Sequence, residues 1–248
     1  MGSCGLTRKK WFWIAPTAIV VAIILLSAYL LGLFGGREEP YNPVIDPGEF
    51  TTIINNTYLP LIPGTIFTYE GVSDEGLERN IVVVTSQTRI VIGVTCTQVW
   101  DRVWLNGSLV EETLDWYAQD SEGNVWYFGE DSKELENGIV VSTEGSWEAG
   151  VDGAKPGIVM EAHPVVGDKY RQEYYKGEAE DMAKILALNA SVTVPFGSYT
   201  GCLQTNEWTP LERGYSEDKY FAPGIGMVQE LVVEGGTGYM KLVDMQVN

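Results

Sequence analysis

The chain has 248 residues, with 34 Asp or Glu against 16 Lys or Arg and a single His, and its formal net charge is −18. Such a charge repels phosphate backbones, so nucleic acid is a poor candidate partner. One histidine excludes His-rich metal centres and most His-based catalytic pairs. The apolar share of 45% is typical of a folded protein.

An uncharged run from Trp11 to Phe34 is long enough to cross a bilayer core of about 30 Å. Cations precede it at positions 8–10 and acids follow at 38–39, so the positive-inside rule places the N-terminus in the cytoplasm. The alternative is a cleaved signal peptide, whose apolar region is normally shorter. We therefore predict a cytoplasmic tail over 1–10 and a transmembrane signal-anchor over 11–36 in the cytoplasmic membrane.

The remaining chain is predicted to lie outside the membrane in two parts. Residues 37–57 contain Pro40, Pro43 and Pro47 with little periodicity, which indicates an extended stalk. Residues 58–248 have the size of one domain. Their many turn signals and aromatic residues predict a mainly β fold, an antiparallel meander forming a curled sheet, half-barrel or sandwich.

Asn106-Gly107 is the strongest hairpin signal. Pairing outward from it sets Trp104 opposite Leu109 and Arg102 opposite Glu111, and it brings Asp101 opposite Glu112. Like charges directly opposite are destabilising, so a cation, Arg102 or a register shift must relieve that pair.

Three further turns and one ambiguous segment complete the meander. A three-residue loop with Gly123 left-handed predicts pairs of Tyr117 with Tyr127 and of Ala118 with Trp126. Asn137-Gly138 marks another turn. Gly235-Gly236 marks a third, pairing Glu230 with Lys241 and Val232 with Tyr239. Residues 178–188 fit a short helix and a strand equally well.

Several phrases together resemble a known group. They are Tyr58–Gly64 with Phe67-Thr-Tyr69, Asp115–Asp120 with Gly123–Gly129, Pro195-Phe-Gly197, and Tyr220–Val228. The set resembles a widespread family of uncharacterised secreted or membrane-anchored prokaryotic β proteins, whose closing phrase is Tyr-Ala-Pro-Gly-Val-Gly-Leu-Val. Phe221, Ile225 and Met227 depart from that phrase conservatively. The resemblance implies an extracytoplasmic β domain and transfers no catalytic residues.

Cys96 and Cys202 each lie in a strand-like run beyond the predicted membrane segment. In an oxidising compartment they predict a disulfide, and the alternative is a pair of buried free thiols. Glu161 and His163 face the same way on a strand but lack further ligands nearby, so no metal is expected there.

The short acidic clusters fit a solvated surface better than Ca²⁺ sites. The chain also lacks a phosphate loop and a dinucleotide fingerprint, so no cofactor is expected. Carboxylate pairs among aromatics leave a glycan hydrolase as an alternative function.

The aromatic hairpins carry the main functional signal. Trp100, Trp104, Tyr117 and Tyr127 share one amphipathic face, predicted either to be covered by other strands or to bind a ligand. We expect a non-enzymatic envelope or surface binding module, with a half-barrel carrier of lipid or another apolar ligand as the first alternative. Asn55, Asn106 and Asn189 head glycosylation sequons on the outward side.

Overall fold

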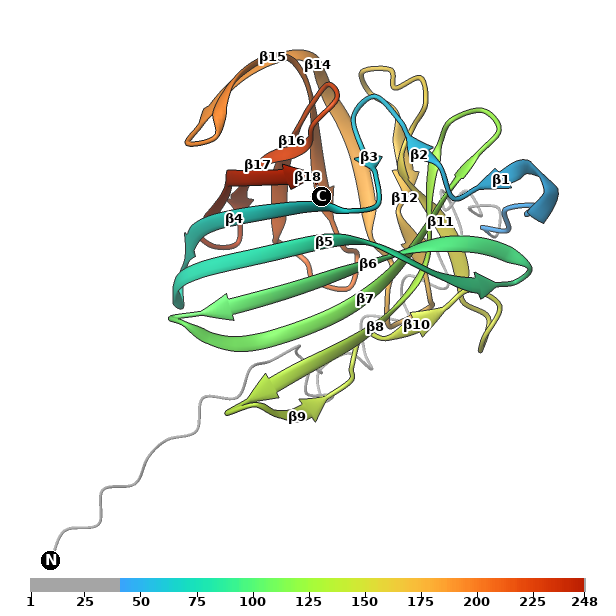
Figure 1. The fold of residues 1–248 in the computed structure, drawn as a ribbon, viewed down its shortest axis with the longest axis horizontal. Helices are drawn as coiled ribbons and strands as arrows, with labels where there is room; N and C mark the ends of the chain where they lie inside the picture. The colour runs from blue at the N-terminus through green and yellow to red at the C-terminus, as the bar shows by residue number, and fades with distance from the viewer. Residues whose placement is uncertain (1–40, 248) are drawn as a thin grey trace, which may run out of the picture. The chain divides into compact units, whose positions relative to one another are not determined.

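The computed structural model describes residues 41–247, which form one extensively twisted antiparallel sheet that curls toward a nearly closed barrel (Figure 1). Its strand order is β12-β14-β15-β16-β17-β18-β4-β5-β6-β7-β8-β11-β13. The strands on this path are β4 (Thr65–Ser73), β5 (Gly76–Val91), β6 (Val94–Leu105), β7 (Ser108–Asp120), β8 (Val125–Glu136), β11 (Lys155–Met160), β12 (Lys169–Arg171), β13 (Glu173–Tyr174), β14 (Met182–Val194), β15 (Gly197–Trp208), β16 (Ser216–Ala222), β17 (Gly226–Glu234) and β18 (Tyr239–Val247).

The two strands at the ends of this order, β12 and β13, are adjacent in the sequence. Strand β13 pairs with β11, strand β12 pairs with β14, and only Gln172 separates β12 from β13. The Gln172 amide donates to the Asp181 carbonyl at 2.8 Å. A side chain at Gly157 of β11 would collide with the backbone of Gln172, so glycine permits the close approach here. We call residues 169–174 the seam of the barrel.

The mainly β fold is confirmed, and the ambiguous segment is resolved in favour of a strand, β14. The predicted membrane segment lies outside the described residues. Within the part of the chain that the structure describes, no helix is long and apolar enough to cross a membrane.

The chain from Tyr41 to Thr57, predicted as stalk, packs against the β domain. It contains a 3₁₀ turn (Pro47–Glu49), β1 (Phe50–Thr51), which pairs with β7, and β2 (Ile54–Asn55), which pairs with β3 (Pro60–Leu61). Ile54 is completely buried, and Phe50 packs edge-on against Phe128 at 5.4 Å. The prolines extend this stretch, and its apolar side chains attach it to the domain.

The hairpin registers test the sequence pairing directly. Tyr117 pairs with Tyr127 and Ala118 with Trp126, as predicted. Trp104 also pairs with Leu109, but a bulge between Val103 and Trp104 shifts the rest of that hairpin by one residue. Thr113 therefore faces Asp101, and Arg102 faces Glu112 rather than Glu111. The register shift removes the predicted clash between Asp101 and Glu112.

The Gly235-Gly236 hairpin differs from the prediction by one residue. Its loop extends to Gly238, whose carbonyl accepts from the Val232 amide at 3.0 Å, so Gln229 rather than Glu230 pairs with Lys241. A one-residue slip moves every side chain to the other face of a strand. Glu230 consequently lies on the inner face of the sheet, together with Lys219 of β16.

Two hydrophobic clusters hold the domain together. The larger one fills the barrel and includes the fully buried Val84, Ile185, Leu203 and Leu242. The second contains Trp116, Phe128 and Trp147 and is completed by partly buried Ile45 and Phe50 from the N-terminal stretch. Two further short strands lie beside β8, namely β9 (Ile139–Ser142) and β10 (Trp147–Glu148).

Candidate ligand-binding groove and acidic inner face

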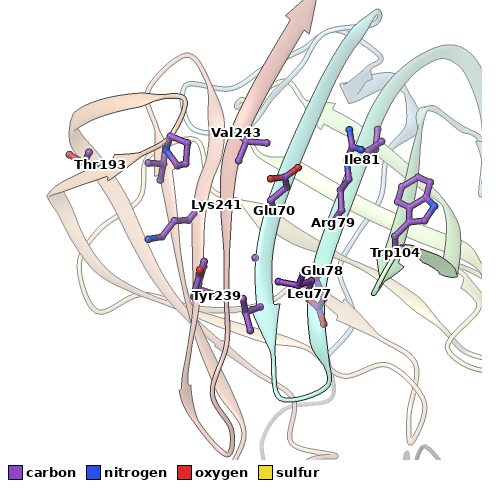
Figure 2. A pocket seen from close by; sticks show the side chains of 15 residues that line it. Glu70, Leu77, Glu78, Arg79, Ile81, Trp104, Thr193, Tyr239, Lys241 and Val243 are labelled. Atoms are coloured by element: carbon purple, nitrogen blue, oxygen red, sulfur yellow. The ribbon is translucent and has the colours of Figure 1, made fainter.

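The outer face of β18, β4, β5 and β6 forms a groove of about 1110 Å³ (Figure 2). One wall is Trp104 of β6, and the opposite wall is the tip of the β14–β15 hairpin at Thr193, Val194 and Pro195. Between them lie apolar side chains that include Leu77, which is 68% exposed, and Tyr239, which is 41% exposed. This volume is slightly above the range of about 300–1,000 Å³ that is typical of small-molecule pockets, so the groove has room for a larger ligand.

The floor of the groove carries charges of both signs. Glu70 on β4 lies between Arg79 on β5 and Lys241 on β18 in the strand register. No ion pair within 4.0 Å joins these three in the described chain, so all can contact a ligand. Glu78 also lines the groove. Two cations against two acids make the groove locally balanced in a chain with a net charge of −18.

Trp104 and Trp100 are held by an arginine between them. The Arg102 guanidinium lies 3.8 Å from the Trp100 ring centroid and 5.3 Å from that of Trp104. The three residues alternate along β6 and therefore share its outer face. Cation–π contacts of this kind fix both rings, which presents Trp104 to the groove as a rigid wall.

The four aromatic residues predicted to bind a ligand do not form one site. Of the four, Trp104 lines the groove, and Trp100 lies further along the same face. Tyr117 and Tyr127 stack on each other at 4.8 Å on the inner side of β7 and β8. Tyr127 is only 8% exposed and donates to the Asp115 carboxylate at 2.6 Å. These two tyrosines therefore belong to the barrel interior.

The inner face of the same sheet is strongly acidic. We define the carboxyl belt as the inner-facing acids that influence one another across the barrel, namely Asp101, Glu111, Asp115, Glu130, Glu173, Glu207, Glu217 and Glu230. In residues 41–247, Lys219 is the one cation within 4.0 Å of any of them. It lies 3.1 Å from Glu207, 3.5 Å from Glu230 and 3.8 Å from Glu217.

Electrostatics divide the belt into two parts. Near Lys219, burial alone would lower the pKa of that lysine, but the surrounding carboxylates raise it well above its usual value. Burial raises the pKa of Glu230 to about 7, against the opposing effect of Lys219. In the other part, burial raises the pKa of Asp115 to about 7, although the Tyr127 hydrogen bond lowers it.

Glu173 connects this second part to the seam. Its carboxylate accepts from the Trp147 indole at 2.9 Å and is 8% exposed. Burial, followed by repulsion from Asp181, raises the pKa of Glu173 to about 8. Burial and the charge of Asp115 raise the pKa of Glu130 well above its ordinary value. Burial thus disfavours the charged forms of these carboxyl groups and moves their titration upward in pH.

The predicted disulfide between Cys96 and Cys202 is wrong. Both thiols are free and buried, Cys202 in the larger hydrophobic cluster and Cys96 in the second. Burial raises the pKa of Cys96 to about 12 and also raises that of Cys202, so both are inert protonated thiols. Their similar strand contexts gave no information on which cluster each side chain enters.

His163 is exposed, and Glu161 is partly buried with an unpartnered carboxylate oxygen. Across the described residues, no group of three or more His, Cys, Asp and Glu side chains is arranged to hold a metal ion.

The sequons differ in how their asparagines are held. Both amide atoms of Asn106 are engaged, by the Glu75 carbonyl and the Leu77 amide, and Asn55 is bonded to Gln119. Asn189 is exposed on β14. Glycosylation at all three stays a prediction, with Asn106 the least reactive.

Comparison with known proteins finds similar solved structures but no matching sequence family. No protein family model and no curated protein matches the sequence. Two crystal structures are similar over 77% of this chain and 99% of their own. A Bacteroides fragilis protein, described as exported with a YmcC-like fold, has a TM-score of 0.46 at 15% identity. A Parabacteroides distasonis protein, described as a lipoprotein, has a TM-score of 0.43 at 11% identity. This similarity assigns neither a family nor an activity.

Proposed function

We propose that this protein is a non-enzymatic binding module, anchored in the cytoplasmic membrane by residues 11–36, whose outer groove binds an apolar segment of a protein partner outside the cell membrane. The observation that carries the proposal is the groove between Trp104 and the β14–β15 hairpin tip. It combines a fixed aromatic wall with exposed aliphatic side chains and unpaired charges. Interfaces concentrate their binding energy on such aromatic anchors.

The groove favours a polypeptide over a purely apolar or a purely anionic ligand. Leu77 and Tyr239 offer apolar contact, whereas Arg79, Lys241 and Glu70 offer donors and acceptors side by side. A polypeptide segment supplies both kinds of group at short intervals. The locally balanced charge also avoids the repulsion that the rest of this acidic protein exerts on anions.

The carrier alternative requires room for an apolar ligand inside the barrel, and that interior is occupied by the larger hydrophobic cluster, the carboxyl belt and Lys219. Native mass spectrometry of the full chain in detergent separates the two functions. If a lipid co-purifies with the protein and is lost when Leu77 is replaced by Asp, the ligand of the groove is an apolar molecule and not a protein segment.

The experiment that tests the proposal is photocrosslinking in intact cells. A benzophenone amino acid is placed at Leu77 in the groove or at Ile139 on β9, which are 68% and 69% exposed and so provide a matched pair. We expect a discrete crosslinked protein from position 77 that position 139 does not give.

The captured partner is then purified and its affinity for the full chain is measured. Trp104→Ala should weaken binding at least about tenfold, as removal of an aromatic anchor does. Equal crosslinking from both positions, or unchanged affinity of Trp104→Ala, would contradict the proposal.

A further inference from the structure

The seam is the weakest part of the barrel wall. Strand β12 contains three residues and β13 contains two, whereas the strands that they pair with, β14 and β11, contain 13 and six. Closure of the sheet therefore depends on few ladder hydrogen bonds. Local opening begins where buried contacts and backbone hydrogen bonds are fewest.

Glu173 supplies a large share of the contacts at this point. It is one of the two residues of β13, it pairs with Pro156 of β11, and its side chain accepts from Trp147. Trp147 in turn packs edge-on against Tyr127 at 5.4 Å, inside the second hydrophobic cluster. The position of this carboxyl group therefore fixes the seam to the aromatic core.

The charged and titratable groups around Glu173 are almost all acidic. Facing it are Asp115 and Tyr117 of β7, Tyr127 and Glu130 of β8, and Asp181 before β14. The nearest cations on the adjoining strands are engaged elsewhere. Arg171 of β12 lies 3.9 Å from Glu180, and Lys155 of β11 donates to the Tyr41 carbonyl. An ionised Glu173 is thus opposed by carboxyl groups, and no cation of residues 41–247 lies within 4.0 Å of it.

We propose that the barrel has a proton-operated seam, in which protonated Glu173 holds β13 in place and its ionisation as the medium becomes alkaline loosens β12 and β13. The rest of the carboxyl belt acts in the same direction, because each further ionised acid adds repulsion across the interior. The seam of the barrel is then most firmly closed in a mildly acidic medium. This inference does not depend on the function of the outer groove.

The direction of the pH effect follows from proton binding. Groups whose folded pKa exceeds the unfolded value bind more protons in the folded state, so their stabilising effect is complete below the unfolded value of about 4. It is lost as the pH rises through about 7 to 8, the folded values of Asp115, Glu230 and Glu173. Most acidic proteins with ion-paired carboxylates show the opposite trend.

The test uses hydroxyl-radical footprinting of the full chain in detergent at pH 5.5 and pH 8.5. Trp147 and Tyr170 report on the seam because they are 4% and 9% exposed when it is closed. Phe67 of β4, which is 4% exposed and lies in the larger hydrophobic cluster, reports on global unfolding. We expect oxidation of Trp147 and Tyr170 to rise several-fold at pH 8.5 while Phe67 stays protected.

Glu173→Gln keeps an acceptor for the Trp147 indole but cannot ionise, so it should abolish most of this rise. Glu136→Gln, an exposed position at the end of β8, is the matched control and should behave like the parent protein. The melting temperature of the parent should also fall by at least about 5 °C between the two pH values, and less in Glu173→Gln.

If Glu173→Gln does not fold, Asp181→Asn removes the neighbouring repulsion and should likewise reduce the rise. Equal oxidation of Trp147 at both pH values in the parent protein would overturn the proposal. So would a rise in Glu173→Gln as large as that of Glu136→Gln.

Discussion

The outer groove over β18, β4, β5 and β6 differs sharply from the inner face of the sheet to which these strands belong. On the outer face, Glu70, Arg79 and Lys241 alternate in sign and line an accessible groove. On the inner face, the belt acids come from β6, β7, β8, β13, β15, β16 and β17, and within residues 41–247 Lys219 of β16 is the one cation within 4.0 Å of any of them. Successive side chains of a strand point to opposite faces, so one short sequence can serve two purposes. The outer residues are available for recognition, and the inner ones control stability.

The sharpest test of this contrast exchanges one lysine on each face for methionine. Lys219→Met leaves Glu207, Glu217 and Glu230 close together without a cation, and should lower the free energy of unfolding by about 3 kcal/mol at pH 7. Lys241→Met on the outer face should change it by less than about 0.5 kcal/mol. Urea unfolding of both variants provides the measurement. Equal effects would mean that the two faces are energetically alike.

A second pair removes one hydroxyl from each face. Tyr127→Phe deletes the buried hydrogen bond to Asp115 and should cost about 1.5 kcal/mol, again by urea unfolding. Tyr239→Phe removes a hydroxyl from a side chain that is 41% exposed, and should be neutral within about 0.5 kcal/mol. A neutral Tyr127→Phe would show that Asp115 finds another partner.

Trp104→Ala tests whether a residue of the outer groove contributes more to binding than to stability. The loss of its contact with Arg102 should cost about 1 kcal/mol of stability, while Trp100 retains the closer contact at 3.8 Å. The variant should no longer bind the partner in the affinity measurement. Its circular dichroism spectrum should stay like that of the parent protein, because the fold persists. Loss of the fold would assign Trp104 a structural role.

The smallest expected effect concerns the two thiols. Because Cys96 and Cys202 are free and lie in separate clusters, a reducing agent should not shift the melting temperature of the full chain. A lower melting temperature under reducing conditions would contradict this and would indicate that a disulfide joins Cys96 and Cys202 after all.

The sequence predicted the β class and several turns because these depend on local chemistry. Asn106-Gly107 and Asn137-Gly138 adopt the positive φ values that such turns require. The Ile92-Gly93 turn between β5 and β6 was not identified, since a β-branched residue at a φ of 43° carries no turn signal.

The groove and the carboxyl belt depend on long-range pairing, which local patterns do not specify. Glu230 was paired with Lys241 rather than with Met240 because the Gly235-Gly236 loop is longer than two residues. A signal for part of the belt was nevertheless present: Glu111 and Asp115 of β7 are four residues apart, and so are the residues that pair with them on β8, Glu134 and Glu130. Since an even spacing places side chains on one face of a strand, these acids would have predicted one acidic face across the two paired strands.

The pairing of β18 with β4 has a consequence for how the protein is made. Thr65 of β4 pairs with Val247 of β18, which is 182 residues further along the chain. At a synthesis rate of 5–20 residues per second, β4 waits roughly 10–40 s for its partner to appear. Throughout that time one edge of the growing sheet has unpaired backbone groups, which can pair with another chain. The nascent chain is therefore exposed to misassembly at this edge until β18 has been synthesised.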